Sequence, residues 1–201
     1  MWGGAQFASP CQGDEDAIIK KTRQIYEAWE GMEVMFTAQE YNIQNGASEN
    51  YEGTISMKKD KFVLTTPQMT VWFDGVTQWS LQRNDEVHID KPASDDILLN
   101  PMLLFRDYNK NYKATLTGES TSHNAKKAYD LTFTPQRKTN IEKIELQIER
   151  NTSLPAKLVI TLRNAIRITI TINGWKATSL SDEFFVFPKA SYPNVEIIDL
   201  R

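Results

Sequence analysis

The second half of the chain is dominated by an alternation of apolar and polar residues. In the segment 166–173 every even-numbered residue is an isoleucine, and the residues between them are Arg167, Thr169, Thr171 and Asn173. Similar alternation occurs at 129–134 and 144–149. Because successive side chains of a β-strand point to opposite faces, this pattern predicts strands with one apolar and one wet face. Such strands are typical of an antiparallel sheet.

The first half continues the same theme after Gly31, with Asp74-Gly75 as a strong hairpin signal. The expected strands are 34–39, 51–58, 61–66, 69–73, 76–82, 87–90, 129–134, 144–149, 158–162, 166–173 and 195–200. This gives about ten or eleven strands, mostly joined by short turns. Since no linker rich in glycine or serine divides the 201 residues, we expect one domain over 14–201, preceded by a flexible tail at 1–13.

Two segments break the pattern of strands. Residues 14–31 predict the one long helix, with an acidic first turn and Gly31 as its stop. Its apolar stripe is Ile18, Thr22, Ile25, Trp29 and Met32. Residues 93–107 predict one or two short apolar helical turns, because Asn100-Pro101 is a favourable helix start and Met102 to Phe105 follow it.

Composition disfavours several classes of function. Lys and Arg total 23 against 26 for Asp and Glu, so the net charge of −3 offers no basic excess for a phosphate backbone. One cysteine, Cys11, cannot form an intramolecular disulfide or a zinc site. With only two histidines, the chain has few ligands for a catalytic metal site that is rich in histidine. No apolar run approaches the roughly 18 residues that a membrane-spanning helix needs.

The first eight residues carry neither a positive n-region nor an apolar h-region, so as written they are not a signal peptide. Either the protein is cytosolic, or an export signal has been removed. Cys11 follows Ser9-Pro10, which matches a lipidation box poorly. We therefore interpret Cys11 as a free thiol in the tail rather than a lipid anchor.

No set of residues indicates catalysis. The sequence has no GxSxG elbow, phosphate-cradling glycine loop, HExxH pair or calcium loop. Ser122-His123 fits a solvated hairpin turn, and Asp95-Asp96 fit a helix start. Glu145, Gln147 and Glu149 share one polar strand face, which a solvated surface explains. We predict a non-enzymatic protein without metal or cofactor.

An apolar face on so many strands needs a cover. A sheet this wide tends to curl or close, and the stripe of the 14–31 helix is too narrow to cover it alone. We therefore predict a mainly β fold of the α+β class: a single curved, incompletely closed antiparallel sheet, or half-barrel, with the long N-terminal helix and a short helical lid at 97–105 over its concave side. The alternation itself leaves open whether that side is a packed core or a hydrophobic cavity.

A series of local motifs resembles one family. The motifs are Val34 to Gln39 after the helix, the glycine-led strand and basic turn 53–62, the hydrophobic–Asp–Gly–Xaa–Thr–Xaa–Trp hairpin 72–81, the apolar segment 100–105, and the closing segments 182–188 and 195–200. In this order, over about residues 14–201, they resemble the bacterial outer-membrane lipoprotein carrier family, the LolA-like proteins.

The resemblance implies a periplasmic carrier that binds the acyl chains of lipoproteins in a hydrophobic cavity and shuttles them from the inner to the outer membrane. The expected cavity residues are Trp72, Trp79, Leu81, Leu131, Phe133, Leu146, Ile148, Ile168 and Ile170. The expected lid residues are Met102, Leu103 and Phe105. Lys59 stands in the basic turn where an arginine of the family is implicated in handing cargo on, and it keeps the charge without the planar fork.

The implied partners are acylated lipoproteins, an inner-membrane lipoprotein-releasing transporter and an outer-membrane acceptor, with only transient membrane contact, no nucleic acid and a monomeric carrier. An alternative is a lipid- or lipoprotein-binding sensor of the same fold without a carrier cycle. A lipid hydrolase would need the nucleophile and base that the sequence lacks.

Overall fold

The computed structural model describes residues 13–82, 86–91, 97, 103–106 and 108–201. Of the expected tail only Gly13 is described, so Cys11 lies outside. The expected helix starts near Ser94 and Asn100 and the lid residue Met102 also lie outside the described residues.

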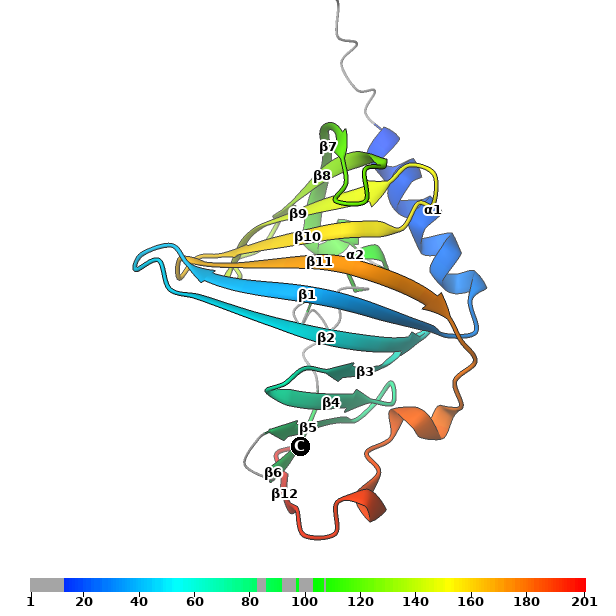
Figure 1. The fold of residues 1–201 in the computed structure, drawn as a ribbon, viewed down its shortest axis with the longest axis vertical. Helices are drawn as coiled ribbons and strands as arrows, with labels where there is room; N and C mark the ends of the chain where they lie inside the picture. Colours follow the sequence, from blue (N-terminus) through cyan, green and yellow to red (C-terminus); the bar gives the residue numbers. More distant parts are fainter. Residues whose placement is uncertain (1–12, 83–85, 92–96, 98–102, 107) are drawn as a thin grey trace, which may run out of the picture.

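The described strands form one open sheet of 12 strands, in the order β12-β6-β5-β4-β3-β2-β1-β11-β10-β9-β8-β7 (Figure 1). The strands are β1 Met32–Asn42, β2 Ser48–Lys58, β3 Lys61–Thr65, β4 Met69–Phe73, β5 Gln78–Gln82, β6 Glu86–Asp90, β7 Tyr112–Thr121, β8 Lys127–Pro135, β9 Ile141–Glu149, β10 Pro155–Leu162, β11 Ile166–Ala177 and β12 Glu196–Asp199. The helices are α1 Asp14–Ala28, α2 Leu103–Arg106 and α3 Tyr108–Asn111, with the 3-10 helices η1 Asp182–Phe185 and η2 Lys189–Ser191.

The prediction of a mainly β chain with a single open sheet is confirmed, with two differences. The sheet has twelve strands instead of ten or eleven. All pairs are antiparallel except one, since β12 runs parallel to β6. The parallel direction of β12 is possible because its connection from β11 is long. Between these strands the chain passes through η1 and η2 over residues 178–195, whereas a tight hairpin would force an antiparallel neighbour.

Two antiparallel meanders, β1–β6 and β7–β11, meet at the pairing of β1 with β11. The register runs from Met32 opposite Ala177 to Asn42 opposite Ile166, with an irregularity at Met35/Phe36. Figure 1 shows this pair in the middle of the sheet. α1 lies beside the β7–β10 end, and the C-terminal segment lies beside the β3–β6 end.

Helix α1 ends at Ala28, three residues before the predicted stop. Its fully buried residues are Ile19 and Thr22, while Ile18 and Ile25 are half-buried. The Thr22 hydroxyl donates to the Ile18 carbonyl oxygen at 3.2 Å. The buried stripe is thus rotated toward Ile19 relative to the prediction, because α1 packs against α2 and against β7 at the edge of the sheet.

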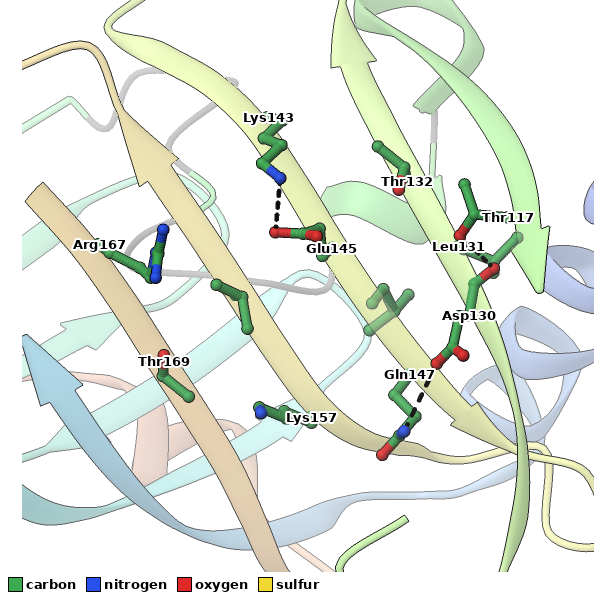
Figure 2. A pocket seen from close by; sticks show the side chains of 12 residues that line it. Thr117, Asp130, Leu131, Thr132, Lys143, Glu145, Gln147, Lys157, Arg167 and Thr169 are labelled. Atoms are coloured by element: carbon green, nitrogen blue, oxygen red, sulfur yellow. Dashed lines mark hydrogen bonds and ion pairs between the residues drawn. The ribbon is translucent and has the colours of Figure 1, made fainter. Parts of the chain in front are cut away.

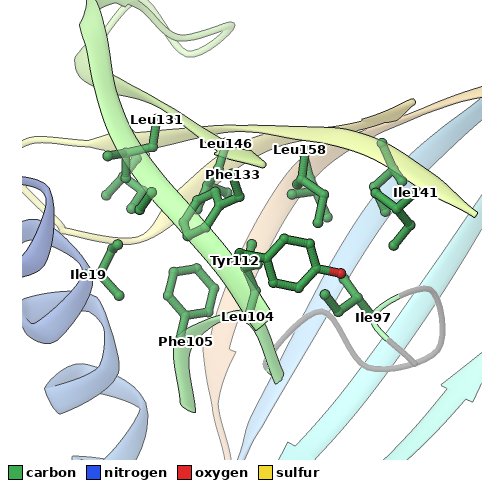
Figure 3. Close-up of a cluster of buried hydrophobic side chains, with 14 of the residues drawn as sticks. Ile19, Ile97, Leu104, Phe105, Tyr112, Leu131, Phe133, Ile141, Leu146 and Leu158 are labelled. Atoms are coloured by element: carbon green, nitrogen blue, oxygen red, sulfur yellow. The ribbon is translucent and has the colours of Figure 1, made fainter. Parts of the chain in front are cut away.

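The sheet face toward α1 and α2, here called the inner face, carries two contiguous apolar clusters. A row of apolar side chains crosses six paired strands, and its members are Leu116, Leu131, Leu146, Leu158, Ile170 and Ala38. Leu131 is 1% exposed and Leu146 3% exposed. This is the region shown in Figure 3. The period-two alternation therefore builds the core as predicted at this end of the sheet.

At the β3–β6 end of the sheet, large apolar side chains are also buried on the face opposite the inner face. On β4, Val71 is buried on the inner face and Trp72 on the opposite face. Trp72 pairs with Trp79 of β5, and both pack with Phe185 and Phe187 of the C-terminal segment. On β5 and β6 it is the polar Ser80 and His88 that follow Val71 across the inner face. The chain after β11 thus supplies a second cover for a second apolar surface.

Gly53 of β2 lies directly opposite Phe36 of β1, and the Phe36 ring lies over it. A Cβ at residue 53 would come within 2.9 Å of Phe36 Cε2 and of the Thr65 carbonyl oxygen. Real Cβ atoms do not approach other atoms so closely. The absence of a side chain at this position therefore lets the aromatic ring fill the centre of the inner face.

We expect Gly53→Ala to destabilise the protein by about 1–3 kcal/mol, since overpacking forces the Phe36 ring or the β3 backbone to move. Chemical denaturation measures the loss. The control is Gly118→Ala in β7, where a Cβ would meet nothing within 4 Å, so its effect should stay within about 0.5 kcal/mol. Equal stability of the two variants would contradict the role given to Gly53.

Candidate functional site

A narrow apolar cavity lies between the inner face of the sheet, α1 and α2. Its volume is about 50 Å³. The lining comes from two helices and five strands, and consists of Tyr26, Val34, Ile55, Met57, Leu104, Phe105, Leu146, Pro155, Leu158, Ile170, Ile172 and Trp175. The site is therefore built by the inner face of the sheet together with the two helices that cover it.

The cavity is too small for a lipid chain in this conformation. A water molecule occupies about 30 Å³ in the liquid, and a cavity that binds benzene measures about 150 Å³. The space is closed by side chains of α2, because Leu104 is fully buried and Phe105 is 5% exposed. Ile97 is buried in the same cluster (Figure 3). A larger apolar ligand can enter only where these side chains give way.

Three aromatic rings meet at one end of the cavity. The Tyr26 ring lies 5.5 Å from that of Phe105 and 5.7 Å from that of Trp175, centroid to centroid. The Tyr26 hydroxyl is buried and has no hydrogen-bond partner among the described residues. Burial raises the pKa of this phenol well above its usual value. Tyr26 therefore presents a neutral, unpaired hydroxyl in apolar surroundings.

A second hollow of about 460 Å³ adjoins this end of the cavity. The two spaces share Pro155, Ile172 and Trp175. β10 begins at Pro155, whereas β11 continues to Ala177 with β1 as its partner, so the sheet has a step here. A hydrogen bond crosses the step, in which the Trp175 indole Nε1–H donates to the Pro155 carbonyl oxygen at 3.1 Å.

Glu149 lines the polar side of this hollow and is only 5% exposed. Its carboxylate accepts hydrogen bonds from Ser122, Asn124 and Lys126, each at 3.2 Å, and from Thr152 at 3.3 Å. Burial alone would raise the pKa of Glu149, but the bonds from Asn124, Lys126 and Ser122 together outweigh it and lower the pKa.

This network corrects two sequence-based interpretations. Glu149 is not on a solvated face, since the 122–126 turn folds over it. Ser122 is buried as a donor to Glu149, whereas His123 beside it is exposed. Glu145 and Gln147 do lie on the wet outer face, as expected. There they border a shallow polar hollow with Asp130, Lys143 and Arg167 (Figure 2).

The residues predicted to line a cavity fall into three groups. Leu146 and Ile170 line it. Four others belong to the adjoining inner cluster, where they pack beside the cavity without lining it: Leu131, Phe133, Ile148 and Ile168. The remaining three lie in the cluster under the C-terminal segment, away from the cavity: Trp72, Trp79 and Leu81. On β4 and β5 these three side chains alternate with the residues of the inner face, so they point to the opposite face of the sheet.

The lid residues divide as well. Phe105 lines the cavity as a residue of α2, and Leu103 begins that helix. The prediction missed Leu104, which follows directly in the same apolar run. It also missed the strand residues Leu158 and Ile172, although both lie in phase with residues that it named. Nothing in the local pattern distinguishes Tyr26 from a core tyrosine.

Lys59 lies in the hairpin between β2 and β3, exposed and with a left-handed backbone (φ 54°). Its neighbours Lys58 and Lys61 both pair with Asp182 of η1, at 3.1 Å and 3.0 Å. Hydrogen bonds from these two lysines hold the pKa of the Asp182 carboxyl below its usual value. The hairpin is therefore anchored to the C-terminal segment while Lys59 extends from its tip.

Two negative findings apply to the described part of the chain. No group of three or more His, Cys, Asp and Glu residues there could hold a metal ion. No helix within the same residues is long and apolar enough to cross a membrane.

Comparisons with known proteins agree with this architecture. Solved structures share the fold, among them the following two. A LolA superfamily protein from Nitrosomonas europaea is 11% identical with a TM-score of 0.52, covering 86% of this chain and 97% of its own. A DUF1329 family protein from Desulfovibrio piger is 13% identical with a TM-score of 0.51, covering 88% and 96%. No curated protein matches the sequence.

The family comparison is more specific than the likeness of fold. Residues 7–165 match the model of the family described as outer membrane lipoprotein carrier protein LolA. The match includes α1, the α2 segment and all of the apolar row on the inner face except Ile170 of β11. The chain is therefore a divergent member of the outer membrane lipoprotein carrier family, the LolA-like proteins.

Proposed function

We propose that this protein is a periplasmic carrier that holds the acyl chains of lipoproteins against the inner face of its sheet and shuttles them from the inner to the outer membrane. The observation that carries the proposal is the apolar cavity of this family member, which Leu104 and Phe105 of α2 and Tyr26 of α1 line opposite the sheet.

The energetics suit reversible binding. Burying an acyl chain contributes about 0.8 kcal/mol per methylene, so a chain of about fourteen methylenes contributes on the order of 11 kcal/mol. Exposing a buried apolar side chain costs about 1.5–3 kcal/mol. Displacing Ile97, Leu104 and Phe105 would therefore offset part of the gain. The remainder holds the cargo, and the closing side chains favour its release to a tighter acceptor.

In this proposal the α2 segment is the lid. This segment, with Phe105 in it, moves away when acyl chains enter and returns when the chains leave. The partners are acylated lipoproteins, a lipoprotein-releasing transporter of the inner membrane and an acceptor at the outer membrane. Lys59, at the tip of the β2–β3 hairpin, is proposed to contact the acceptor during transfer.

The direct test is binding of one purified lipoprotein in its acylated form and in an unacylated form that lacks the lipidated cysteine. Because the cavity recognises acyl chains, the acylated form should co-elute with this protein and the unacylated form should not. Equal binding of both forms would contradict the proposal, since recognition would then lie in the folded part of the cargo.

A second prediction concerns the cost of opening the lid. Phe105→Ala should lower stability by about 3–5 kcal/mol, because it removes a buried aromatic side chain. It should nevertheless tighten binding of a fluorescent fatty acid, because less apolar contact is lost on opening. The control is Phe184→Ala, since Phe184 of η1 is 44% exposed. Weaker fatty-acid binding by the Phe105 variant, at a temperature where it is folded, would contradict the lid.

A third prediction separates transfer from binding. Lys59→Asn removes the charge with a residue that tolerates the left-handed backbone. It should leave the affinity for acylated lipoprotein unchanged and slow delivery to the outer-membrane acceptor severalfold, measured as the rate of appearance of cargo on that acceptor. The control is Lys113→Gln, which removes one positive charge from an exposed position of β7 and should leave transfer unchanged. Unchanged transfer by the Lys59 variant would remove this residue from the proposal.

A further inference from the structure

The Tyr26 hydroxyl is the chemically unusual group of the cavity. The other lining side chains are apolar apart from the Trp175 indole, whose N–H is already donated to the Pro155 carbonyl oxygen. The hydroxyl is buried and unpaired among the described residues. A buried hydroxyl without a partner is costly, and a phenylalanine would fill the same space without that cost. The arrangement therefore suits a ligand that brings a hydrogen-bond acceptor.

The position of Tyr26 narrows the kind of acceptor. Its ring lies next to those of Phe105 and Trp175, and Trp175 also lines the hollow at the step in the sheet. Beyond Trp175 is the hollow lined by Asn124, Lys126 and Glu149, which is roomy and partly polar. A molecule crossing this boundary would need an apolar chain inside, an acceptor at Tyr26 and a polar end outside.

We propose that the Tyr26 hydroxyl donates a hydrogen bond to the carbonyl oxygen that links an acyl chain to its polar headgroup, and that the headgroup leaves the protein beside Trp175 into the hollow bordered by Asn124, Lys126 and Glu149. This inference rests on the proposed function and adds to it a chemical requirement, an ester or amide carbonyl, and an exit. Because burial keeps the phenol protonated, it is a donor throughout the physiological pH range.

The exit follows from strand length. β11 pairs with β10 only as far as Thr171, which lies opposite Lys157, and continues beside β1 to Ala177, so at this step Trp175 lines both spaces. The contact that bridges the step is the Trp175–Pro155 hydrogen bond, at the end of a strand. A headgroup placed here avoids the desolvation it would suffer inside the cavity, since Lys126 and Asn124 are exposed.

The test uses two synthetic lipopeptides that carry the same glyceryl-cysteine peptide with two hexadecyl-length chains, joined by ester bonds in one and by ether bonds in the other. The native protein should bind the ester form about 2- to 10-fold more tightly, which corresponds to one net hydrogen bond. Tyr26→Phe should abolish this preference by weakening ester binding alone. Tyr192→Phe, whose ring packs on Phe187 in the other apolar cluster, should keep it.

The outcomes separate the two claims. Equal affinity of the native protein for both lipopeptides, or an ester preference that survives Tyr26→Phe, overturns the inference while leaving acyl binding intact. Failure of the native protein to bind either lipopeptide overturns the proposed function as well. The thermal stability of the ligand-free Tyr26→Phe variant should equal or exceed that of the native protein. A marked loss would show that the hydroxyl has a structural partner, and would also overturn the inference.

Discussion

The pairing of β1 with β11 is the interaction on which the rest of the structure depends. It joins strands from opposite ends of the chain, in a register that extends from Met32 opposite Ala177 to Asn42 opposite Ile166. Without it the two meanders would each end in an open edge, and edges of this kind invite pairing with other chains. With it, a single apolar row crosses from Leu116 of β7 to Ala38 of β1.

That continuous row is an apolar surface that the helices must shield from water. A broad apolar face must be covered, yet α1 buries fully only Ile19 and Thr22 within its length. The remaining cover comes from Leu104 and Phe105 of a four-residue helix. Since so short a helix owes its stability to tertiary contacts, its position over the sheet depends on the same side chains that fill the cavity. Closure and the proposed binding of acyl chains thus compete for one apolar surface.

The sequence predicts most of this sheet because its signals are local. The alternation at 144–149 and 166–173 places Leu146 and Ile170 on the inner face, and Asp74-Gly75 forms the β4–β5 turn, with the Asp74 carboxylate accepting the backbone N–H of Thr77 at 2.8 Å. The prediction is wrong for Glu149 because the 122–126 turn that buries it is distant in sequence. The run Val71-Trp72-Phe73 carries no alternation, so the pattern could not assign Trp72 to a face.

By itself, then, the sequence determined that this chain forms a wide sheet of strands with alternating apolar and polar residues, because strand periodicity is fixed by backbone geometry between adjacent residues. The tertiary structure decided which cover each apolar surface receives. α1 and α2 close over Leu158 and Ile172, while the segment after β11 closes over Trp72 and Trp79 on the opposite face. It also decided that the Tyr26 hydroxyl is buried beside the cavity that this residue lines. Such placements depend on contacts between residues far apart in the chain, which no local pattern encodes.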